Sequence, residues 1–294
     1  MSKFIEKVRQ GIIPTDKDWT EYLVIAHEKA PSMTPHAYAD YKTKEGLSSY
    51  ELLAQTCKLY QNKNITAVDL ACGDGYLISF VLPLLNKPSK IIGVDMSNAE
   101  LAIARNRLKE PNISFINAHA QKIPLDDHSV DVILCHMAFM LMLPLEPVVQ
   151  EISRILKPGG SFSAVIGGVP TDDPFYLQVR RLYSEFLASR FPNMKDTKTG
   201  DSRVASEDGL KQLFTLDLGF NERIETLNFE LQYIVEPAGI WSLMKDMYFV
   251  GMLPDIEQDN LRKAFIDLGD KNKAKDGKVT FGYPMRKFTI TKQS

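Results

Sequence analysis

The stretch VDLACGDG, residues 68–75, ends an apolar run with an acid and continues into a turn that holds two glycines. This pattern is typical of the first strand and helix of a doubly wound α/β sheet, where ligands bind beyond the carboxyl ends of the strands. Gly73 and Gly75 allow the backbone to come within contact distance of a ligand. Asp69 is a poor neighbour for a pyrophosphate and a good one for a group with amines or a positive charge.

The charge balance argues against large anionic partners. The 294 residues include 35 Lys and Arg and 37 Asp and Glu, for a formal net charge of −2. No bulk field attracts nucleic acid or an anionic membrane, and the lysine-rich segments 195–198 and 271–278 are expected to be solvated loops. We therefore expect a small-molecule partner, with no nucleic acid and no membrane; the sequence leaves the oligomeric state open.

The cysteines and the apolar stretches bear on the cellular compartment. Cys57, Cys72 and Cys135 are odd in number and widely spaced, which predicts neither a disulfide framework nor a metal site. Residues 1–20 hold no apolar block of signal-peptide length, and the longest apolar stretch, 138–145, is too short to span a bilayer. The expected location is therefore the reducing cytoplasm.

Short apolar runs alternate with amphipathic segments in the middle of the chain. The runs expected to form strands buried on both faces are 65–70, 90–95, 112–117, 130–135 and 161–168. Helical spacing marks 97–109, where Ser97 and Glu100 have the spacing of a capping box, and 145–156, which Pro158-Gly159-Gly160 follow. This alternation favours a parallel sheet with right-handed crossovers.

The flanking segments are expected to add helices and two further strands to this sheet. The expected organisation is a helical N-terminal cover in 1–64, a cofactor-binding α/β core in 65–169, a helical lid insertion with the sixth strand in 170–260, and a C-terminal strand returning to the sheet in 261–294. Within these segments we expect helices at 19–30, 48–60 and 238–253 and strands at 222–235 and 278–291. The fold class is therefore α/β, with a doubly wound, mostly parallel sheet of seven strands.

Two details distinguish between nucleotide cofactors. A dinucleotide-binding turn wants a third glycine three residues after the second, and Ile78 stands at that position. Asp95 ends the second strand, where a carboxylate accepts hydrogen bonds from ribose hydroxyls or merely caps the helix that begins near Ser97. The missing glycine, together with Asp69 and Asp74, argues against a nicotinamide-dependent oxidoreductase.

Taken together, these motifs resemble those of the class I S-adenosylmethionine-dependent methyltransferases, especially the small-molecule subgroup with the ubiquinone and menaquinone methylases. VDLACGDG resembles the first motif of the family, with Ala71 in place of its first glycine. The other matching stretches are GVDMS at 93–97, FINAHAQKIPLDDHSVDVILC at 115–135, RILKPGGSF at 154–162 and LFTLDLGF at 213–220. The resemblance implies a Rossmann-like methyltransferase fold and S-adenosyl-L-methionine as the cofactor.

The resemblance also assigns residues to parts of that cofactor. Gly73 and Gly75 would line its methionine portion, with Asp69 or nearby backbone close to the amino group, and Asp95 would hold the ribose. Met96 would pack against the adenine, Ala120 would offer backbone to the adenine edge, and Cys135 would lie under the cofactor. Where the family usually has an acid beside the adenine amine, this chain has His119, whose neutral imidazole can accept one such bond. The implied cofactor contacts are Asp69, Ala71, Cys72, Gly73, Gly75, Asp95, Met96, His119, Ala120 and Cys135.

Histidines and tyrosines supply the remaining candidates. By the same resemblance, His136 at the carboxyl end of the fourth strand would face the substrate side. It is the leading candidate for a general base, with a structural role as the alternative. The histidines interpreted as surface or packing residues are His27, His36 and His128. The tyrosines that either cover the cofactor or pack in the core are Tyr38, Tyr41 and Tyr50.

The implied reaction is in-line methyl transfer to a small, aromatic or partly apolar metabolite. In such a reaction, alignment of the reactants can supply much of the rate enhancement. The side chains expected to build the acceptor pocket are Phe175, Tyr176, Phe186, Trp241, Met244, Met247, Tyr248 and Phe249. Two other classes stay open. One is a regulatory or interaction protein that binds the cofactor without turnover, and the other, less favoured, is the nicotinamide-dependent oxidoreductase.

Overall fold

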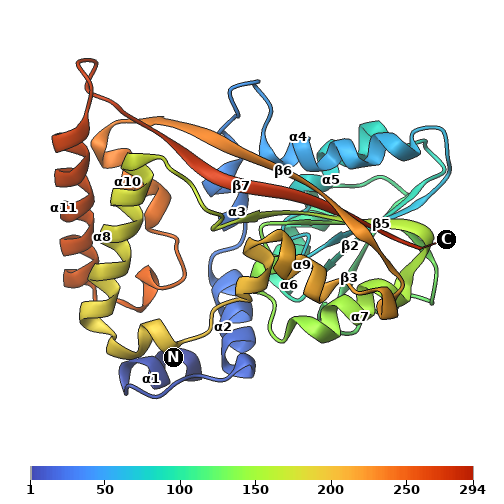
Figure 1. Cartoon of the computed structure of the whole chain (residues 1–294), viewed down its shortest axis with the longest axis horizontal. Helices are drawn as coiled ribbons and strands as arrows, with labels where there is room; N and C mark the ends of the chain where they lie inside the picture. Colours follow the sequence, from blue (N-terminus) through green and yellow to red (C-terminus); the bar gives the residue numbers. More distant parts are fainter. Residues whose placement is uncertain (1, 294) are drawn as a thin grey trace.

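A single seven-stranded sheet organises the computed structural model, which describes residues 2–293 (Figure 1). The strand order is β3-β2-β1-β4-β5-β7-β6; β7 is antiparallel to β5 and to β6, and the other neighbouring strands are parallel. The bounds are β1 Thr66–Leu70, β2 Lys90–Asp95, β3 Ile113–Asn117, β4 Val130–His136, β5 Leu156–Gly167, β6 Phe220–Val235 and β7 Val279–Lys292. The predicted α/β fold with a mostly parallel sheet is confirmed.

Helices precede, connect and follow these strands. The α-helices are α1 Lys3–Arg9, α2 Asp16–Lys29, α3 Met33–Tyr38, α4 Ser49–Ala54, α5 Tyr76–Val81, α6 Asn98–Arg107, α7 Leu145–Ile155, α8 Pro174–Arg190, α9 Glu207–Leu213, α10 Pro237–Met244 and α11 Asp255–Asn272. The short 3₁₀ helices are η1 Gln55–Tyr60, η2 Leu82–Leu84, η3 Phe139–Leu141, η4 Pro192–Asp196, η5 Ser202–Ala205, η6 Leu216–Leu218 and η7 Val250–Met252. Within residues 2–293, no helix is both long and apolar enough to cross a membrane.

The fifth strand begins earlier than the sequence predicts. Leu156 already pairs with Val130, and pairing resumes between Ser161 and Val132 after a shift in register. The Pro158-Gly159-Gly160 segment therefore lies in a bulge of β5 instead of in a turn before it. Gly159 in this bulge has a φ of 75°, which glycine adopts without a steric penalty.

Two predicted helices are each divided, and a third helix was missed. The segment 48–60 forms α4 and then the 3₁₀ helix η1, and 238–253 forms α10 and η7 with a turn between them. Helix α11 buries Leu261, Phe265 and Gly269, which are four residues apart and share one face. Because α11 reaches Asn272, only the remainder of the lysine-rich 271–278 segment is the loop that was expected.

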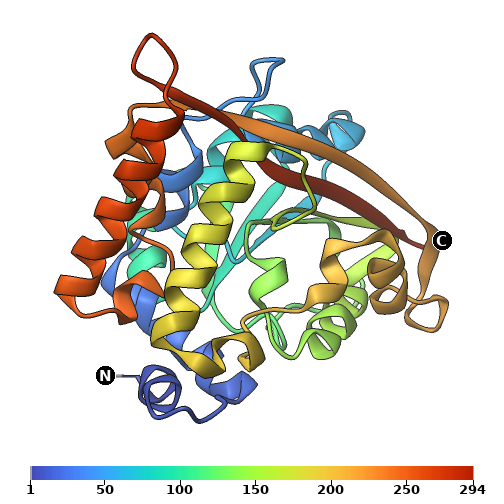
Figure 2. The same cartoon turned by 60° about the vertical axis from the view of Figure 1, so that its left-hand side comes forward.

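The N-terminal segment and the insertion pack together at one end of the sheet. Strands β6 and β7 continue beyond the parallel strands as a long ribbon, and α8 and α11 lie side by side near its far end (Figures 1 and 2). The ring of Trp19 in α2 lies 5.2 Å from that of Phe4 in α1 and 6.1 Å from that of Phe249, which precedes η7. Trp19 Nε1 also donates a 2.8 Å hydrogen bond to Leu141 O, so the cover is tied to the loop that follows β4.

Candidate active site

The turn after β1 brings bare backbone to the edge of a cavity. Ala71, Gly73 and Gly75 have φ values of 57°, 52° and 77°, in the left-handed region that favours glycine. Ala71, Cys72 and Gly73 line the cavity. Gly75 does not line it, and a Cβ built on Gly75 would lie 3.0 Å from Leu108 Cδ1 beside α6. The structure therefore shows Gly75 packed closely against α6, and its predicted contact with the cofactor stays a prediction.

Asp95 joins the tip of β2 to this turn. Its carboxylate accepts a 2.9 Å bond from Gly73 N and a 2.8 Å bond from Ser97 N, one on each oxygen. Burial raises the pKa of Asp95, and the two backbone N–H donors offset part of that effect. Asp95 thus holds the N-cap residue of α6, Ser97, and also lines the cavity. Its contact with the ribose of a cofactor remains a prediction.

Asp69 presents an unpaired acceptor in the wall of the same cavity. It is buried at the end of β1, and its Oδ2 has no hydrogen-bond partner within residues 2–293. Burial and the charges of Asp95 and Asp74 raise the pKa of Asp69 well above its usual range. A buried carboxylate without a partner is costly. An ammonium or sulfonium group bound in the cavity would relieve that cost, so the donor set fits a cationic cofactor.

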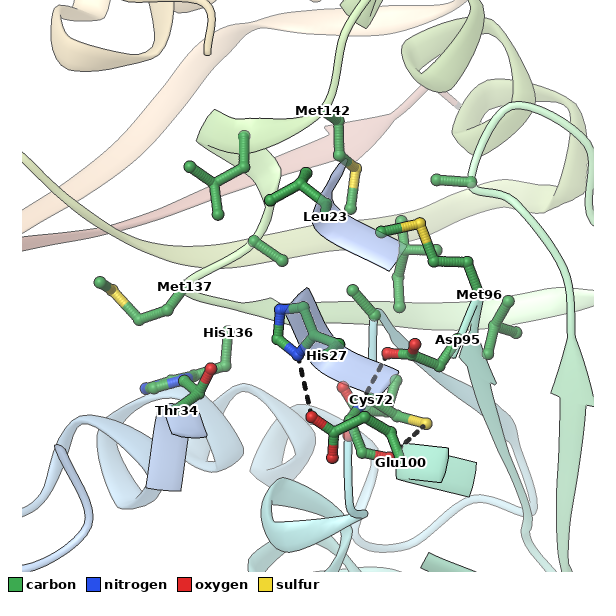
Figure 3. A pocket seen from close by; sticks show the side chains of 18 of the residues that line it. Leu23, His27, Thr34, Cys72, Asp95, Met96, Glu100, His136, Met137 and Met142 are labelled. Carbon is green, nitrogen blue, oxygen red and sulfur yellow. Dashed lines mark hydrogen bonds and ion pairs between the residues drawn. The ribbon is translucent and has the colours of Figure 1, made fainter. Parts of the chain in front are cut away.

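Glu100 and His27 are site residues that sequence reasoning missed. The buried Glu100 carboxylate forms an ion pair with His27 Nδ1 at 2.9 Å, drawn in Figure 3, and His27 Nε2 lies 3.2 Å from Tyr248 Oη. Ser97 Oγ accepts from Glu100 N as predicted, but Glu100 does not return the bond, because Asp95 already holds Ser97 N. Only half of the capping box is present, and the freed carboxylate faces the cover.

Ser32 locks the cover against the core. Its N–H donates to both oxygens of Glu100 at 3.1 Å, and its Oγ donates to Asp74 at 2.7 Å. Asp74 also pairs with Arg107 at 2.8 Å, so this acid is held by the protein itself. Nearby, Glu28 accepts a 2.7 Å bond from Asn98 N at the start of α6. Polar contacts from the end of α2 thus close one side of the cavity.

The tips of β2 and β3 supply the part of the cavity that faces solvent. Met96, His119 and Ala120 line it, as the resemblance implied for the adenine side. His119 is exposed, and its ring has no hydrogen bond to a described residue that would hold it away from a ligand. The contacts of these three residues with the cofactor remain predictions.

The end of β4 places two neighbouring residues on opposite faces of the sheet. His136 lines the cavity, whereas Cys135 is packed in the core on the other face with Ile133. The reason is the alternation of side chains along a strand. Cys135 therefore does not lie under the cofactor as expected, and the structure corrects that prediction.

His136 is enclosed by aromatic and hydroxyl groups. Its ring stacks on Tyr50 with centroids 3.8 Å apart, and its Nε2 lies 2.9 Å from Ser49 Oγ. The Nδ1 atom is buried and has no partner among the described residues. Burial lowers the pKa of His136 to about 3, so the imidazole is neutral at physiological pH.

A second, larger cavity adjoins the first. Its volume is about 300 Å³, against about 110 Å³ for the first. The two share the wall residues Thr34, Met137, Leu141 and Tyr248, so they meet beside the end of β4. Tyrosine and methionine dominate the lining of the second cavity, with Tyr38, Tyr176, Tyr183, Tyr233, Tyr283, Met33, Met140, Met244 and Met247.

Half of the side chains predicted for an acceptor pocket line this second cavity. Tyr176, Met244, Met247 and Tyr248 do so, whereas Phe175, Phe186, Trp241 and Phe249 pack against the surrounding core. Of the three N-terminal tyrosines, Tyr50 lines the first cavity, Tyr38 lines the second, and Tyr41 stacks on Tyr233 at 3.8 Å.

Comparison with known proteins identifies the core. Residues 68–164 match a family model described as a methyltransferase domain. The core of this chain is a class I S-adenosylmethionine-dependent methyltransferase domain. That domain contains β1 to β4, most of β5 and the glycine turn, and its cofactor is S-adenosylmethionine. This match argues against the nicotinamide-dependent oxidoreductase.

The curated relatives that match the methyltransferase domain are named as quinone methyltransferases. The demethylmenaquinone methyltransferase of Lactococcus lactis is 33% identical over 122 residues, which are 40% of this chain and 48% of the relative. The ubiquinone/menaquinone biosynthesis C-methyltransferase UbiE of Campylobacter jejuni is 30% identical over 106 residues, 35% of this chain and 44% of the relative. The chain thus spans about half the length of these curated relatives.

Solved structures share the fold of the methyltransferase domain and its additions. The YcgJ protein of Bacillus subtilis superposes with a TM-score of 0.56 at 17% identity, over 84% of this chain and 98% of that chain. Phosphoethanolamine N-methyltransferase 2 of Haemonchus contortus, in complex with S-adenosyl-L-methionine, gives a TM-score of 0.53 at 15% identity, over 100% of this chain and 60% of that chain. At these identities the likeness concerns the fold.

Proposed function

We propose that this chain transfers the methyl group of S-adenosylmethionine to a small acceptor that binds in the tyrosine-lined cavity. The observation that carries the proposal is the junction of the two cavities, whose shared wall includes Met137 at the end of β4. When bound, S-adenosylmethionine supplies a methyl group on a sulfonium, which a nucleophile displaces in line. The protein itself aligns the donor with the acceptor and excludes water from the site.

The residues that face the cofactor contribute in two ways, through exposed backbone and through carboxylate charge. The backbone at Ala71, Cys72 and Gly73 offers close approach. The buried Asp69 offers negative charge to the ammonium, and the half-buried Asp95 offers its carboxylate to the ribose hydroxyls. Because the sulfonium is cationic, unpaired buried carboxylate charge stabilises the bound cofactor. We also propose that Met96, His119 and Ala120 contact the adenine.

The lining of the second cavity supports an aromatic or partly apolar acceptor. Burial raises the pKa of Tyr38, Tyr183 and Tyr248, so these phenols stay neutral and present ring surface. A cavity of about 300 Å³ suits a small molecule, and nothing about its walls suits nucleic acid. Given three unpaired, buried cysteines, we place the reaction in a reducing cytoplasm.

His136 suits a positioning role better than the base role first expected. A group with a pKa of about 3 is a weak base, and proton transfer is efficient when the pKa lies near the operating pH. We therefore propose that alignment carries the rate and that His136 supports Tyr50 and the wall of the cavity. The replacement His136→Gln should keep kcat/KM within about threefold. A loss of a hundredfold or more would assign the base to His136.

The experiment that tests the proposed function has two readouts. Calorimetry with S-adenosylhomocysteine should show binding, and Asp95→Ala should weaken it about a hundredfold because hydrogen bonds to a charged group contribute about 1.5–3 kcal/mol each. Transfer of a CD₃ group from labelled S-adenosylmethionine to a metabolite extract should give a mass-shifted product. Glu222→Ala, an exposed acid in β6, is the matched control.

The two readouts separate the alternatives. Binding without any mass-shifted product would favour a regulatory protein that binds the cofactor without turnover. An absence of heat with either S-adenosylmethionine or S-adenosylhomocysteine, in a folded sample, would reject the proposed function.

A further inference from the structure

The larger cavity has almost no charge in its walls. Among the described residues that line it, only Arg180 and Asp246 are charged. Arg180 lies on α8 and has no hydrogen bond or ion pair with a described residue. A guanidinium beside an otherwise aromatic cavity is therefore available to a ligand.

A row of aromatic contacts shows where Arg180 lies relative to the cofactor site. From His136 the ring of Tyr38 is 6.4 Å away, Tyr283 follows Tyr38 at 5.4 Å, and Tyr176 follows Tyr283 at 5.5 Å. Arg180 is one helical turn beyond Tyr176 on α8, and both residues line the cavity. Arg180 is therefore separated from His136 of the first cavity by a row of three tyrosine rings.

Most tyrosine hydroxyls around the cavity are already bonded within the protein. Tyr38 and Tyr283 share a 3.2 Å bond, Tyr233 donates to Ala37 O at 3.1 Å, and Tyr248 contacts a histidine of the cover. Tyr176 Oη, in contrast, has no hydrogen-bond partner among the described residues. A free phenol and a free guanidinium thus occur together on α8.

The charge of Arg180 acts on this part of the cavity. Burial raises the pKa of both Tyr176 and Tyr283, and the positive charge of Arg180 partly offsets the effect on each. Asp246 lies elsewhere, in the wall shared with an outer groove beside Lys245. The two charged groups are not paired with each other, so each would favour a ligand of a different sign.

We propose that the acceptor is an elongated aromatic molecule with an anionic group, most simply a carboxylate, which Arg180 and the Tyr176 hydroxyl bind at the end remote from the methylated atom. The inference rests on the proposed function and adds the charge and the orientation of its substrate. Arginine matches this task because its guanidinium recognises a carboxylate with two parallel hydrogen bonds.

The test uses three probes that share a catechol and differ in charge: caffeate, methyl caffeate and dopamine. Each is titrated by calorimetry into the full chain saturated with S-adenosylhomocysteine. We expect caffeate to bind at least tenfold more tightly than methyl caffeate, and Arg180→Gln to remove this difference. Arg181→Gln on the same helix, whose guanidinium pairs with Glu185 and does not line the cavity, should leave it unchanged.

Each other outcome overturns the inference. Equal affinity for caffeate and methyl caffeate would mean that Arg180 does not contribute to binding the carboxylate of the ligand. Tightest binding of dopamine, lost in Asp246→Asn, would assign a cationic acceptor. Binding of none of the probes by a protein that binds S-adenosylhomocysteine would also reject the elongated anionic acceptor, whereas failure to bind S-adenosylhomocysteine would reject the proposed function itself.

Discussion

The two adjoining cavities are built in different ways. The first is formed largely by strand tips and the turns after them. It gathers the buried carboxyl groups of Asp69, Asp74 and Glu100 and the half-buried carboxyl group of Asp95. The second is formed by side chains from α3, α8, α10 and the long β6–β7 ribbon, and it is lined by tyrosine and methionine. One site is organised by charge and bare backbone, the other by ring surface.

Because they are built differently, the two cavities should differ in how freely their lining residues can be substituted. A cationic donor demands carboxylates at defined strand ends, because charge placed a few ångströms away is far less effective in a partly buried site. Apolar surface has no such directional requirement, since its contribution depends on area and fit. The second cavity can therefore change its occupant by substitution in the additions, while the first retains its cofactor.

The largest predicted effect in this comparison comes from adding one methyl group to the wall of the first cavity. Gly73→Ala places a Cβ 3.7 Å from Glu100 Oε2 at a φ of 52°, so it adds strain of about 1–2 kcal/mol and occupies cofactor space. Its affinity for S-adenosylhomocysteine should fall by about tenfold to a hundredfold, measured by calorimetry.

The corresponding substitution in the second cavity is Gly167→Ala. Its Cβ would lie 3.0 Å from Met137 Cε and 3.1 Å from Tyr283 Oη, inside the second cavity. S-adenosylhomocysteine affinity should stay within about twofold, while kcat/KM for the acceptor falls several-fold. If both variants lost cofactor affinity equally, the two cavities would not be separable sites.

Asp69→Asn should move stability and binding in opposite directions. It removes an unpaired buried charge, so the free protein should gain about 1 kcal/mol or more at pH 8, while cofactor affinity falls about tenfold. Urea unfolding and calorimetry measure the two effects. A variant that is less stable than the parent protein at pH 8 would show that Asp69 has a partner in solution.

Because its pKa is raised in the folded state, Asp69 should also make the free energy of unfolding depend on pH. Because the folded state holds this proton above the unfolded value of 3.8, the free energy of unfolding should decrease as pH rises through the folded pKa. Cofactor binding should favour the ionised form, so affinity should rise with pH and binding should release a proton. Calorimetry in buffers of different ionisation enthalpy measures that release, and Asp69→Asn should lower it.

The smallest predicted effect concerns the turn itself. Ala71 has a φ of 57°, which costs an L-residue about 1–2 kcal/mol, and glycine would remove that strain at the expense of unfolded-chain entropy. Ala71→Gly should therefore stabilise the protein by about 0–1 kcal/mol in urea unfolding and leave cofactor affinity unchanged. Destabilisation by more than 1 kcal/mol would show that the Ala71 methyl group packs usefully.

Prediction from sequence succeeded where a pattern is local. The turn with Ala71 and Gly73, the acid at Asp69 and the acid at Asp95 follow apolar runs that identify themselves as strands, and all four residues line one cavity. It failed for Cys135, whose side depends on the register of β4 against the core. A shift of one residue along a strand reverses the face, and the sequence marked the end of the strand only approximately.

His27 and Glu100 show a different reason for failure. Glu100 has the spacing of a capping box, and this local interpretation hid its long-range pairing with His27 in the cover. A buried acid at the start of a helix that already has a cap was the one available signal. Similarly, Arg180 reads as an ordinary exposed residue of α8 until Tyr176 and Tyr283 are seen beside the same cavity.

The sequence by itself determined the α/β core, the family of the domain and the cofactor, because short-range spacing places acids and glycines at the tips of parallel strands. Tertiary structure alone decided which helices close over those tips, which face each strand residue occupies, and how six tyrosines from distant segments enclose one cavity. The physical reason is that backbone turns are specified by neighbouring residues, whereas a cavity forms wherever packed elements leave space between them.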